Sequence, residues 1–148
     1  MLRKLLQTED DVAALVLRLA LGIVIFPHGA QKALGWFGGF GFSGTMGFFT
    51  GTLGIPAVLA FLAILAEFAG SLGLIVGLLG RVAAFGIACN MVVAALMVSL
   101  PHGFFMNWSG KQAGEGIEFH LLALGIAIAL MIRGSGAASV DGILARQV

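Results

Sequence analysis

Long runs of apolar residues fill most of the chain and are separated by short polar or glycine-rich segments. Four such runs cover residues 12–34, 53–79, 82–100 and 117–132. A helix needs about 20 mostly apolar residues to cross the hydrocarbon core of a bilayer. The fourth run is short, so we expect its helix to begin one turn earlier, near residue 115. The pattern predicts an all-α integral membrane protein built as a four-helix bundle.

Composition agrees with this prediction and narrows the chemistry. Of the 148 residues, 59% are hydrophobic and only 10% are charged, which lies outside the range of soluble globular proteins. The net charge of +1 gives no basic surface for nucleic acid. Cys89 is the one cysteine, so an intramolecular disulfide, a CxxC redox pair and an all-cysteine metal site are excluded. Any redox chemistry must therefore come from a bound cofactor or a partner.

Short polar segments flank the apolar runs and predict where helices begin. Thr8, followed by Asp10 and Asp11, suits a helix start, because negative charge is stabilised at the positive end of the helix dipole. Residues 139–141 (Ser-Val-Asp) can cap a short interfacial helix that carries Ile143 and Leu144.

The distribution of basic residues predicts the orientation. Four crossings place both termini and the turn near residue 80 on one side of the membrane. That side holds most of the basic residues: Arg3, Lys4, Arg81, Arg133 and Arg146. The other side holds Lys32 and Lys111 near the span ends. Because cytoplasmic loops carry an excess of Lys and Arg, we expect both termini in the cytoplasm.

The two loops on the other side are rich in glycine and aromatic residues. They cover residues 35–42 and 103–108 and contain both tryptophans, Trp36 and Trp108. The favoured interpretation is an aromatic belt at the depth of the lipid headgroups. The alternative is a flat cap over a binding pocket that opens laterally to lipid.

Charged residues inside the apolar runs are the first candidates for function. An unpaired charge in hydrocarbon is costly, so each charged side chain must form an ion pair inside the bundle or serve a function. Arg18 and Glu67 lie on antiparallel helices, and a rise of about 1.5 Å per residue brings their levels within reach of a long arginine. Asn90 on the third helix reaches a similar level. We therefore predict a buried Arg18–Glu67 ion pair or relay with Asn90 as a hydrogen-bond partner. A role in fixing helix register alone is an equally strong interpretation.

A second polar cluster is expected near the far end of the first helix. His28, Gln31 and Lys32 follow at i, i+3 and i+4 and share one face, just after a proline that should kink the helix. On the fourth helix, Glu118 and His120 start at the same level but point about 200° apart, so one of them can face His28. We predict that Glu118 is that residue, because an acid needs a buried partner more than a neutral imidazole does.

Three interpretations of this second cluster remain open. In the first, a quinone headgroup is bound there, with His28, Lys32 and Glu118 as the catalytic, proton-handling groups. The candidate contacts to the cofactor are His28, Gln31, Trp36, His102, Trp108 and Glu118. In the second and weaker one, His28 with His102 or His120 ligates a haem or a metal ion. In the third, the residues form salt bridges and an interface anchor without chemistry.

An ordered set of short motifs runs through nearly the whole chain. They are Arg-Leu-Ala-Leu-Gly at 18–22, Pro-His-Gly-Ala-Gln-Lys at 27–32, Gly-Trp-Phe-Gly-Gly at 35–39, Ala-Glu-Phe-Ala-Gly at 66–70, Gly-Leu-Leu-Gly-Arg at 77–81, His-Gly-Phe-Phe at 102–105 and Gly-Ile-Glu-Phe-His-Leu-Leu at 116–122. Together they resemble the DoxX family of small bacterial membrane proteins. The resemblance implies one transmembrane domain over residues 1–148 in the bacterial inner membrane. It also implies an oxidoreductase role, since the family is named from a subunit linked to thiosulfate:quinone and terminal-oxidase chemistry.

Two functions follow as hypotheses. The first is a membrane subunit of a quinone-linked oxidoreductase, with a soluble or membrane redox partner. The second is a non-enzymatic scaffold, binding or small-solute transport bundle that partners a soluble enzyme. Self-association through glycine-rich faces is compatible with both, because small residues let helices approach closely in membranes.

Overall fold

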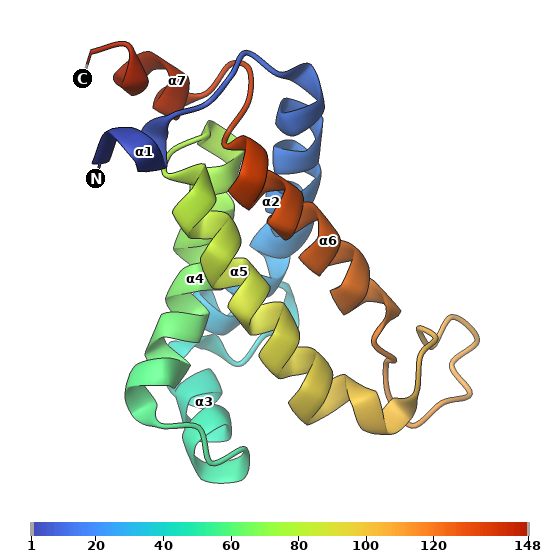
Figure 1. Cartoon of the computed structure of the whole chain (residues 1–148). Coiled ribbons are helices and arrows are strands. Elements are labelled where there is room, and N and C mark those ends of the chain that lie inside the picture. Colours follow the sequence, from blue (N-terminus) through green and yellow to red (C-terminus); the bar gives the residue numbers. More distant parts are fainter. Residues whose placement is uncertain (1, 148) are drawn as a thin grey trace.

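The computed structural model describes residues 2–147 and contains no strand within that range. Four long helices dominate it (Figure 1): α2 (Val12–Leu34), α4 (Ala57–Val76), α5 (Gly80–Ala94) and α6 (Glu118–Arg133). Helix α2 packs against α4 and α6, and α5 packs against the same two helices, so the four form a closed ring. The described parts of both terminal segments lie at one end of the ring, called the terminal end below (Figure 1). The opposite end is called the far end.

Short elements close the two ends. The terminal end carries α1 (Leu2–Leu6) and α7 (Val140–Ala145), and the far end carries α3 (Gly41–Gly47) (Figure 1). The far end also contains 3₁₀ and π-helical turns: η1 (Trp36–Gly38), η2 (Phe48–Thr52), η3 (Ala95–Ser99) and η4 (Leu100–His102). Of these, η2 and η3 are π-helical.

Three helical segments are long and apolar enough to cross a membrane. They cover Val12–Leu34, Ala57–Val76 and Gly80–His102 within the described chain. Helix α6 has 16 residues, fewer than the about 20 that a crossing requires. The all-α membrane architecture is thus confirmed, and a fourth crossing stays a prediction.

The helix ends follow local chemistry that the sequence displays. Asp11 caps α2 by accepting hydrogen bonds from the N–H groups of Ala13 and Ala14, and Gly35 ends the helix with a φ of 75°. The predicted short helix is also confirmed, because Ser139 caps α7 by accepting from the N–H of Gly142, whereas its position at the membrane interface stays a prediction. The prediction for the second apolar run was too long, since α4 begins only after the extended Pro56.

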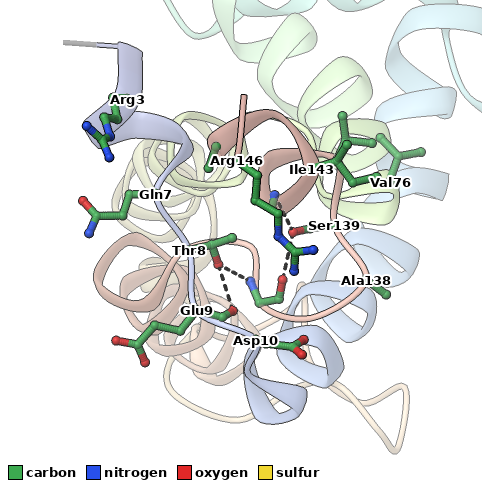
Figure 2. A pocket seen from close by; sticks show the side chains of 14 residues that line it. Arg3, Gln7, Thr8, Glu9, Asp10, Val76, Ala138, Ser139, Ile143 and Arg146 are labelled. Carbon is green, nitrogen blue, oxygen red and sulfur yellow. Dashed lines mark hydrogen bonds between the residues drawn. The ribbon is translucent and has the colours of Figure 1, made fainter. Parts of the chain in front are cut away.

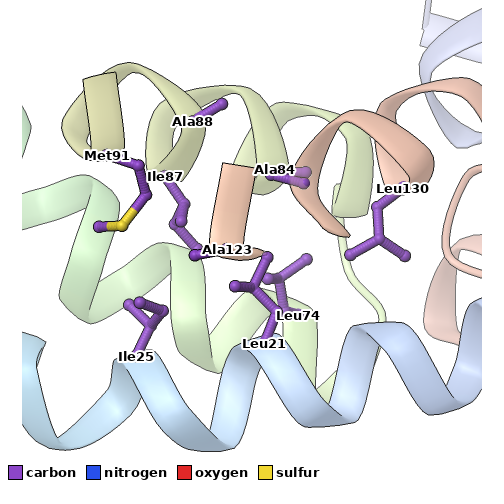
Figure 3. Packing of buried hydrophobic residues seen from close by; sticks show 10 residues of the cluster. Leu21, Ile25, Leu74, Ala84, Ile87, Ala88, Met91, Ala123 and Leu130 are labelled. Atoms are coloured by element: carbon purple, nitrogen blue, oxygen red, sulfur yellow. The ribbon is translucent and has the colours of Figure 1, made fainter. Parts of the chain in front are cut away.

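The hydrophobic core lies where the four long helices meet. Its buried side chains come from all four helices (Figure 3): Leu21, Ile25, Leu74, Ala84, Ile87, Ala88, Met91, Ala123, Ala127 and Leu130. Gly29 brings α2 and α4 into near contact, because a Cβ atom there would lie 2.7 Å from the backbone carbonyl of Glu67. This close approach fixes which side chains of α2 and α4 meet at the far end.

The predicted ion pair between Arg18 and Glu67 is wrong. Arg18 is only 1% exposed, and its guanidinium binds backbone carbonyls instead. Its Nη1 donates to the carbonyls of Leu74 and Ile75 at 2.8 and 2.7 Å, at the carboxyl end of α4. The other nitrogens donate to carbonyls of the segment before α7: Ser135 at 2.9 Å, Ala137 at 3.2 Å and Ala138 at 3.1 Å. The long side chain therefore points toward the terminal end, away from Glu67.

Asp141 complements Arg18 at the same end. It is 1% exposed, and its carboxylate accepts hydrogen bonds from the N–H groups of Leu79 at 2.7 Å and Gly80 at 2.9 Å and from Ser135 Oγ at 2.5 Å. Arg18, Ser135 and Asp141, with the backbone groups that they bind, are called the terminal network below. This network stabilises the α4–α5 turn and holds α7 against it.

Candidate functional site

A cavity of about 360 Å³ lies toward the far end of the helical ring. It is bounded by α2, α4 and α5, by the π-helical turns η2 and η3, and by the first turn of α6. Most of its walls are apolar: Ile25, Phe48, Phe49, Leu53, Ile55, Ala63, Met91, Val93, Ala94, Met97, Val98, Met106 and Phe119. The volume is at the lower end of the about 300–1,000 Å³ typical of small-molecule pockets.

Seven polar residues line this cavity, and besides Ser99 and Glu115 they are five side chains from four long helices, called the cavity cluster below. They are His28 and Lys32 of α2, Glu67 of α4, Asn90 of α5 and His120 of α6. A few convergent polar groups in a mostly apolar pocket are typical of a ligand site.

An ion pair anchors the cavity cluster. Lys32 Nζ lies 2.5 Å from Glu67 Oε2, and the two side chains are 26% and 9% exposed. Asn90 Nδ2 donates to the carbonyl of Ala63 at 2.7 Å and to Glu67 Oε1 at 3.5 Å. The predicted contact between Asn90 and Glu67 is thus confirmed, but the cation beside Glu67 is Lys32. Because the charges of Lys32 and Glu67 balance, this pair can face a neutral ligand without leaving either of the two charges unpaired.

The sequence positions these groups through helix spacing and one glycine. His28 and Lys32 stand one turn apart on α2, which continues through Pro27 as one helix. The close approach at Gly29, between them, brings their face against the backbone of α4 at Glu67. Gln31 belongs to a different contact, since its Nε2 donates to the carbonyl of Phe37 at 3.2 Å outside the cavity.

The prediction that Glu118 rather than His120 faces the cavity is wrong. Glu118 Oε1 accepts hydrogen bonds from the N–H of Met106 at 2.9 Å and from Trp108 Nε1 at 3.1 Å. The carboxylate therefore holds the loop before α6, and the opposite face of the helix turns His120 into the cavity. Phe119 stands beside both imidazoles, with ring centroids 6.0 Å from His28 and 5.7 Å from His120.

His120 leaves hydrogen-bonding capacity unused. Its Nδ1 atom is buried and has no hydrogen-bond partner among the described residues. Most buried polar atoms in proteins have a partner, and an exception calls for an explanation such as a missing ligand or water. The Nδ1 atom itself is covered by protein, so a ligand in the cavity would meet the rest of the imidazole, which lines the space.

The remaining predicted contacts do not line the cavity. Trp36 is 54% exposed and Trp108 is 85% exposed, as expected for side chains at a membrane interface. His102 lies against Gly114 in the loop between α5 and α6. Among residues 2–147, no group of three or more His, Cys, Asp or Glu side chains is arranged to hold a metal ion.

The cavity walls that η2 and η3 contribute were not predicted from the sequence. Residues 41–52 read as a glycine-rich and aromatic stretch, yet they form α3 and η2 and bring Phe48 and Phe49 to the cavity. On the opposite wall, Met97 and Val98 come from η3. Nothing in these apolar sequences distinguishes a π-helical turn from an α-helical one.

A second, open groove of about 700 Å³ lies at the terminal end, between the N-terminal segment and α7 (Figure 2). One hydrogen bond joins its two sides, from the N–H of Gly136 to Thr8 Oγ1 at 2.7 Å, and Ser139 Oγ donates to the carbonyl of Gly136 at 2.8 Å. The first contact joins the two terminal segments and indicates a structural role for this part of the groove.

Comparison with known proteins identifies the family. A sequence model described as DoxX matches residues 13–100, which is more than half of the chain. The chain belongs to the DoxX family. The matched range contains His28, Lys32, Glu67 and Asn90 of the cavity cluster, whereas His120 follows it.

One relative of this DoxX protein covers most of its length. It is a Bacillus subtilis (strain 168) protein named "Putative oxidoreductase CatD", 29% identical over 131 residues, which cover 88% of this chain and 86% of the relative. No solved structure matches.

Proposed function

We propose that this protein is a membrane subunit of a quinone-linked oxidoreductase that binds a quinone, or a similar lipid-soluble carbonyl compound, in the far-end cavity. In this proposal α6 makes a fourth crossing, both termini lie in the cytoplasm, and the membrane is the bacterial inner membrane. One observation carries the proposal: the far-end cavity is apolar over most of its wall but holds an ion pair and two imidazoles.

The cavity cluster suits the two carbonyl oxygens of a quinone ring. These oxygens accept hydrogen bonds, and Lys32 Nζ and the imidazole N–H groups of His28 and His120 are donors that line the same space. Glu67 holds the lysine in place through the 2.5 Å ion pair. Phe119 and the phenylalanines of η2 offer aromatic faces for the ring.

The same residues can hold protons beside a bound carbonyl. Imidazole and ammonium groups donate a proton to an oxygen that gains electrons and recover it afterwards. The chain has one cysteine and no cysteine pair, so the electrons must come from a reduced cofactor that binds this chain or a partner. The name of the Bacillus relative, "Putative oxidoreductase CatD", supports this class of function.

The test is to identify the lipid-soluble molecules that leave the membrane with the purified protein. We expect organic extracts of the wild type to contain quinone and extracts of His28→Ala to contain much less. Gln31→Ala is the matched control, because Gln31 lies on the same helix but donates to the carbonyl of Phe37 outside the cavity. Recovery of phospholipid alone from the wild type would contradict the proposal, as would equal quinone from wild type and His28→Ala.

A second candidate function is favoured by the exposed aromatic residues of the far end. Phe37, Phe40, Phe105 and Trp108 are 64%, 84%, 66% and 85% exposed. A non-enzymatic scaffold would use such a surface to bind another chain. This alternative predicts a stable complex with a partner protein, no bound quinone, and loss of the complex in Phe40→Ser.

A further inference from the structure

We propose that the ligand reaches the far-end cavity sideways, from the bilayer, through a portal between η2 and η3, and that its apolar tail stays in this portal. The ligand class is then a lipid with one polar headgroup and one long apolar chain. This inference depends on the proposed function for the headgroup, and it adds the route and the tail.

The portal consists of residues that line the cavity and are also exposed on the protein surface. Phe48 of η2 is 44% exposed, and Met97 and Val98 of η3 are each 45% exposed. Val93, one turn before η3, is 44% exposed and also lines the cavity. Such residues mark the rim at which the cavity meets the surroundings.

This rim faces hydrocarbon. Val93, Met97 and Val98 belong to the candidate membrane span Gly80–His102. All four rim side chains are apolar, so acyl chains wet them more readily than water does. A ligand dissolved in the bilayer therefore meets the cavity at this rim before it meets any polar group.

Beyond the cavity, the far end is closed by the loop between η4 and α6, which several hydrogen bonds hold in place. Backbone N–H groups of Gly116, Ile117 and Glu118 donate to the carbonyls of Phe105, Gly103 and Phe104, respectively. Glu115, which lines the cavity, holds the loop from the other side, because its carboxylate accepts from the N–H of Asn107 at 2.6 Å. Opening this side requires the loss of several backbone hydrogen bonds, whereas opening the portal requires only rotations of apolar side chains.

Both sides of the portal are π-helical. The turns η2 and η3 each contain five residues. π-Helical turns are rare and are found frequently at functional sites. Their coincidence on the two walls of one opening is an independent reason to assign a function to this side of the cavity.

Size supports a tail that extends out of the protein. A cavity of about 360 Å³ can hold a ring headgroup and the first few carbons of a chain. The rest of a long chain must leave through the rim, where Phe48 and Met97 would contact it. The polar cluster binds the headgroup, and the portal selects for a flexible apolar tail.

The first experiment tests whether the rim faces lipid, and it requires no ligand. In a Trp36→Phe, Trp108→Phe background, a single tryptophan replaces Met97, and its fluorescence is measured in vesicles of phospholipid brominated at mid-chain. We expect strong quenching, similar to that of Val24→Trp, a 47% exposed position of α2 outside the cavity. If brominated lipid does not quench the fluorescence of a tryptophan at position 97, the proposed portal is wrong.

The second experiment measures the uptake of a long-tailed quinone from vesicles by the reconstituted full-length protein. Val93→Trp and Val98→Trp place a bulky ring in the portal and are expected to slow uptake at least tenfold. Val24→Trp, the matched control, should leave the rate unchanged. Two portal variants are used so that a folding defect in one does not decide the result.

Variants of the loop distinguish the two routes. Asn107→Ala removes two side-chain hydrogen bonds to the backbone of Gln112 in the loop, at a residue that does not line the cavity, and should not change the uptake rate if the ligand arrives through the portal. Faster uptake in Asn107→Ala, with unchanged rates in both portal variants, would overturn the inference in favour of the loop side. If the wild type takes up no quinone, the proposed function fails, while quenching at position 97 still decides whether the rim faces acyl chains.

Discussion

Buried charged side chains at the two ends of the molecule differ in their surroundings. In the terminal network, Arg18 and Asp141 are each 1% exposed, and backbone groups and Ser135 occupy their hydrogen-bonding atoms. In the cavity cluster, Lys32 and Glu67 are 26% and 9% exposed, and they border the cavity together with the imidazoles of His28 and His120.

This difference separates structure from function. A buried ion whose donors and acceptors are all occupied has no capacity left for a ligand, so the terminal network stabilises the fold. A cluster with free donors beside a cavity retains that capacity and costs stability until a ligand fills it. Variants at the terminal end should therefore lower stability, and variants at the far end should lower binding.

The largest effect is expected from the terminal network. Arg18→Ala removes the cation that holds the carboxyl end of α4 and the segment before α7, and it should lower the free energy of unfolding by about 3–5 kcal/mol. The measurement is chemical or thermal unfolding in detergent, with Arg146→Ala, an exposed arginine of the same end, as the control. A loss below about 1 kcal/mol would show that the network is not structural.

Removal of the cation in the cavity comes next. Lys32→Ala leaves Glu67 without its ion pair and should lower the free energy of unfolding by about 1–3 kcal/mol while abolishing quinone binding. The double variant Lys32→Met, Glu67→Gln removes both charges and should recover stability without recovering binding. Full binding by this double variant would exclude the ion pair from the ligand site.

A comparison of His120 with Glu118 sharpens the assignment within one helix. His120→Ala should weaken quinone binding about tenfold, equivalent to about 1.4 kcal/mol, because it removes a donor that lines the cavity. Glu118→Gln keeps an oxygen that can accept from Met106 and Trp108 and should bind quinone normally. Binding titrations of the two purified variants check this, and the reverse order of effects would restore Glu118 as the cavity residue.

The smallest effect is a pH dependence at the start of α2. A hydrogen bond from Arg133, followed by one from the N–H of Ala14, lowers the pKa of Asp11 below its usual value near 3.8. A lowered pKa in the folded state stabilises the protein at pH values above the unfolded pKa, and this contribution is lost as the pH falls through the folded pKa. The stability difference between wild type and Asp11→Asn should thus be constant above about pH 5 and disappear in stronger acid.

Unfolding curves recorded between neutral pH and acid measure this difference. Asparagine retains the helix cap, so the comparison isolates the contact with Arg133. Asp10→Asn, a change at the exposed neighbouring residue, is the control. A difference that persists unchanged in strong acid would contradict the assignment.

The sequence predicted the elements whose signals are local. The bounds of α2 were correct because an aspartate cap and a left-handed glycine mark its ends. The cap of α7 at Ser139 was correct for the same reason. Helix α3 and the two π-helical turns were missed, since no local residue type specifies them.

The partners of the buried charges were harder to predict. Arg18 binds carbonyls up to 120 positions away in the sequence, and backbone carbonyls leave no mark in a sequence pattern. The opposed directions of Glu118 and His120 were a sound geometric argument. The choice between them failed because the partners of Glu118 are a backbone N–H and an indole in a loop, which helix geometry does not place.

Photoaffinity labelling tests the central claim most directly. A long-tailed quinone with a photoreactive group on its ring is added to the reconstituted protein, and the labelled residues are mapped by mass spectrometry. If the cavity cluster binds the quinone headgroup, we expect labels on the cavity walls, at Phe49, Met91 or Phe119. Excess unlabelled quinone should suppress these labels. Labels confined to the terminal-end groove, or labelling that excess quinone leaves unchanged, would contradict it.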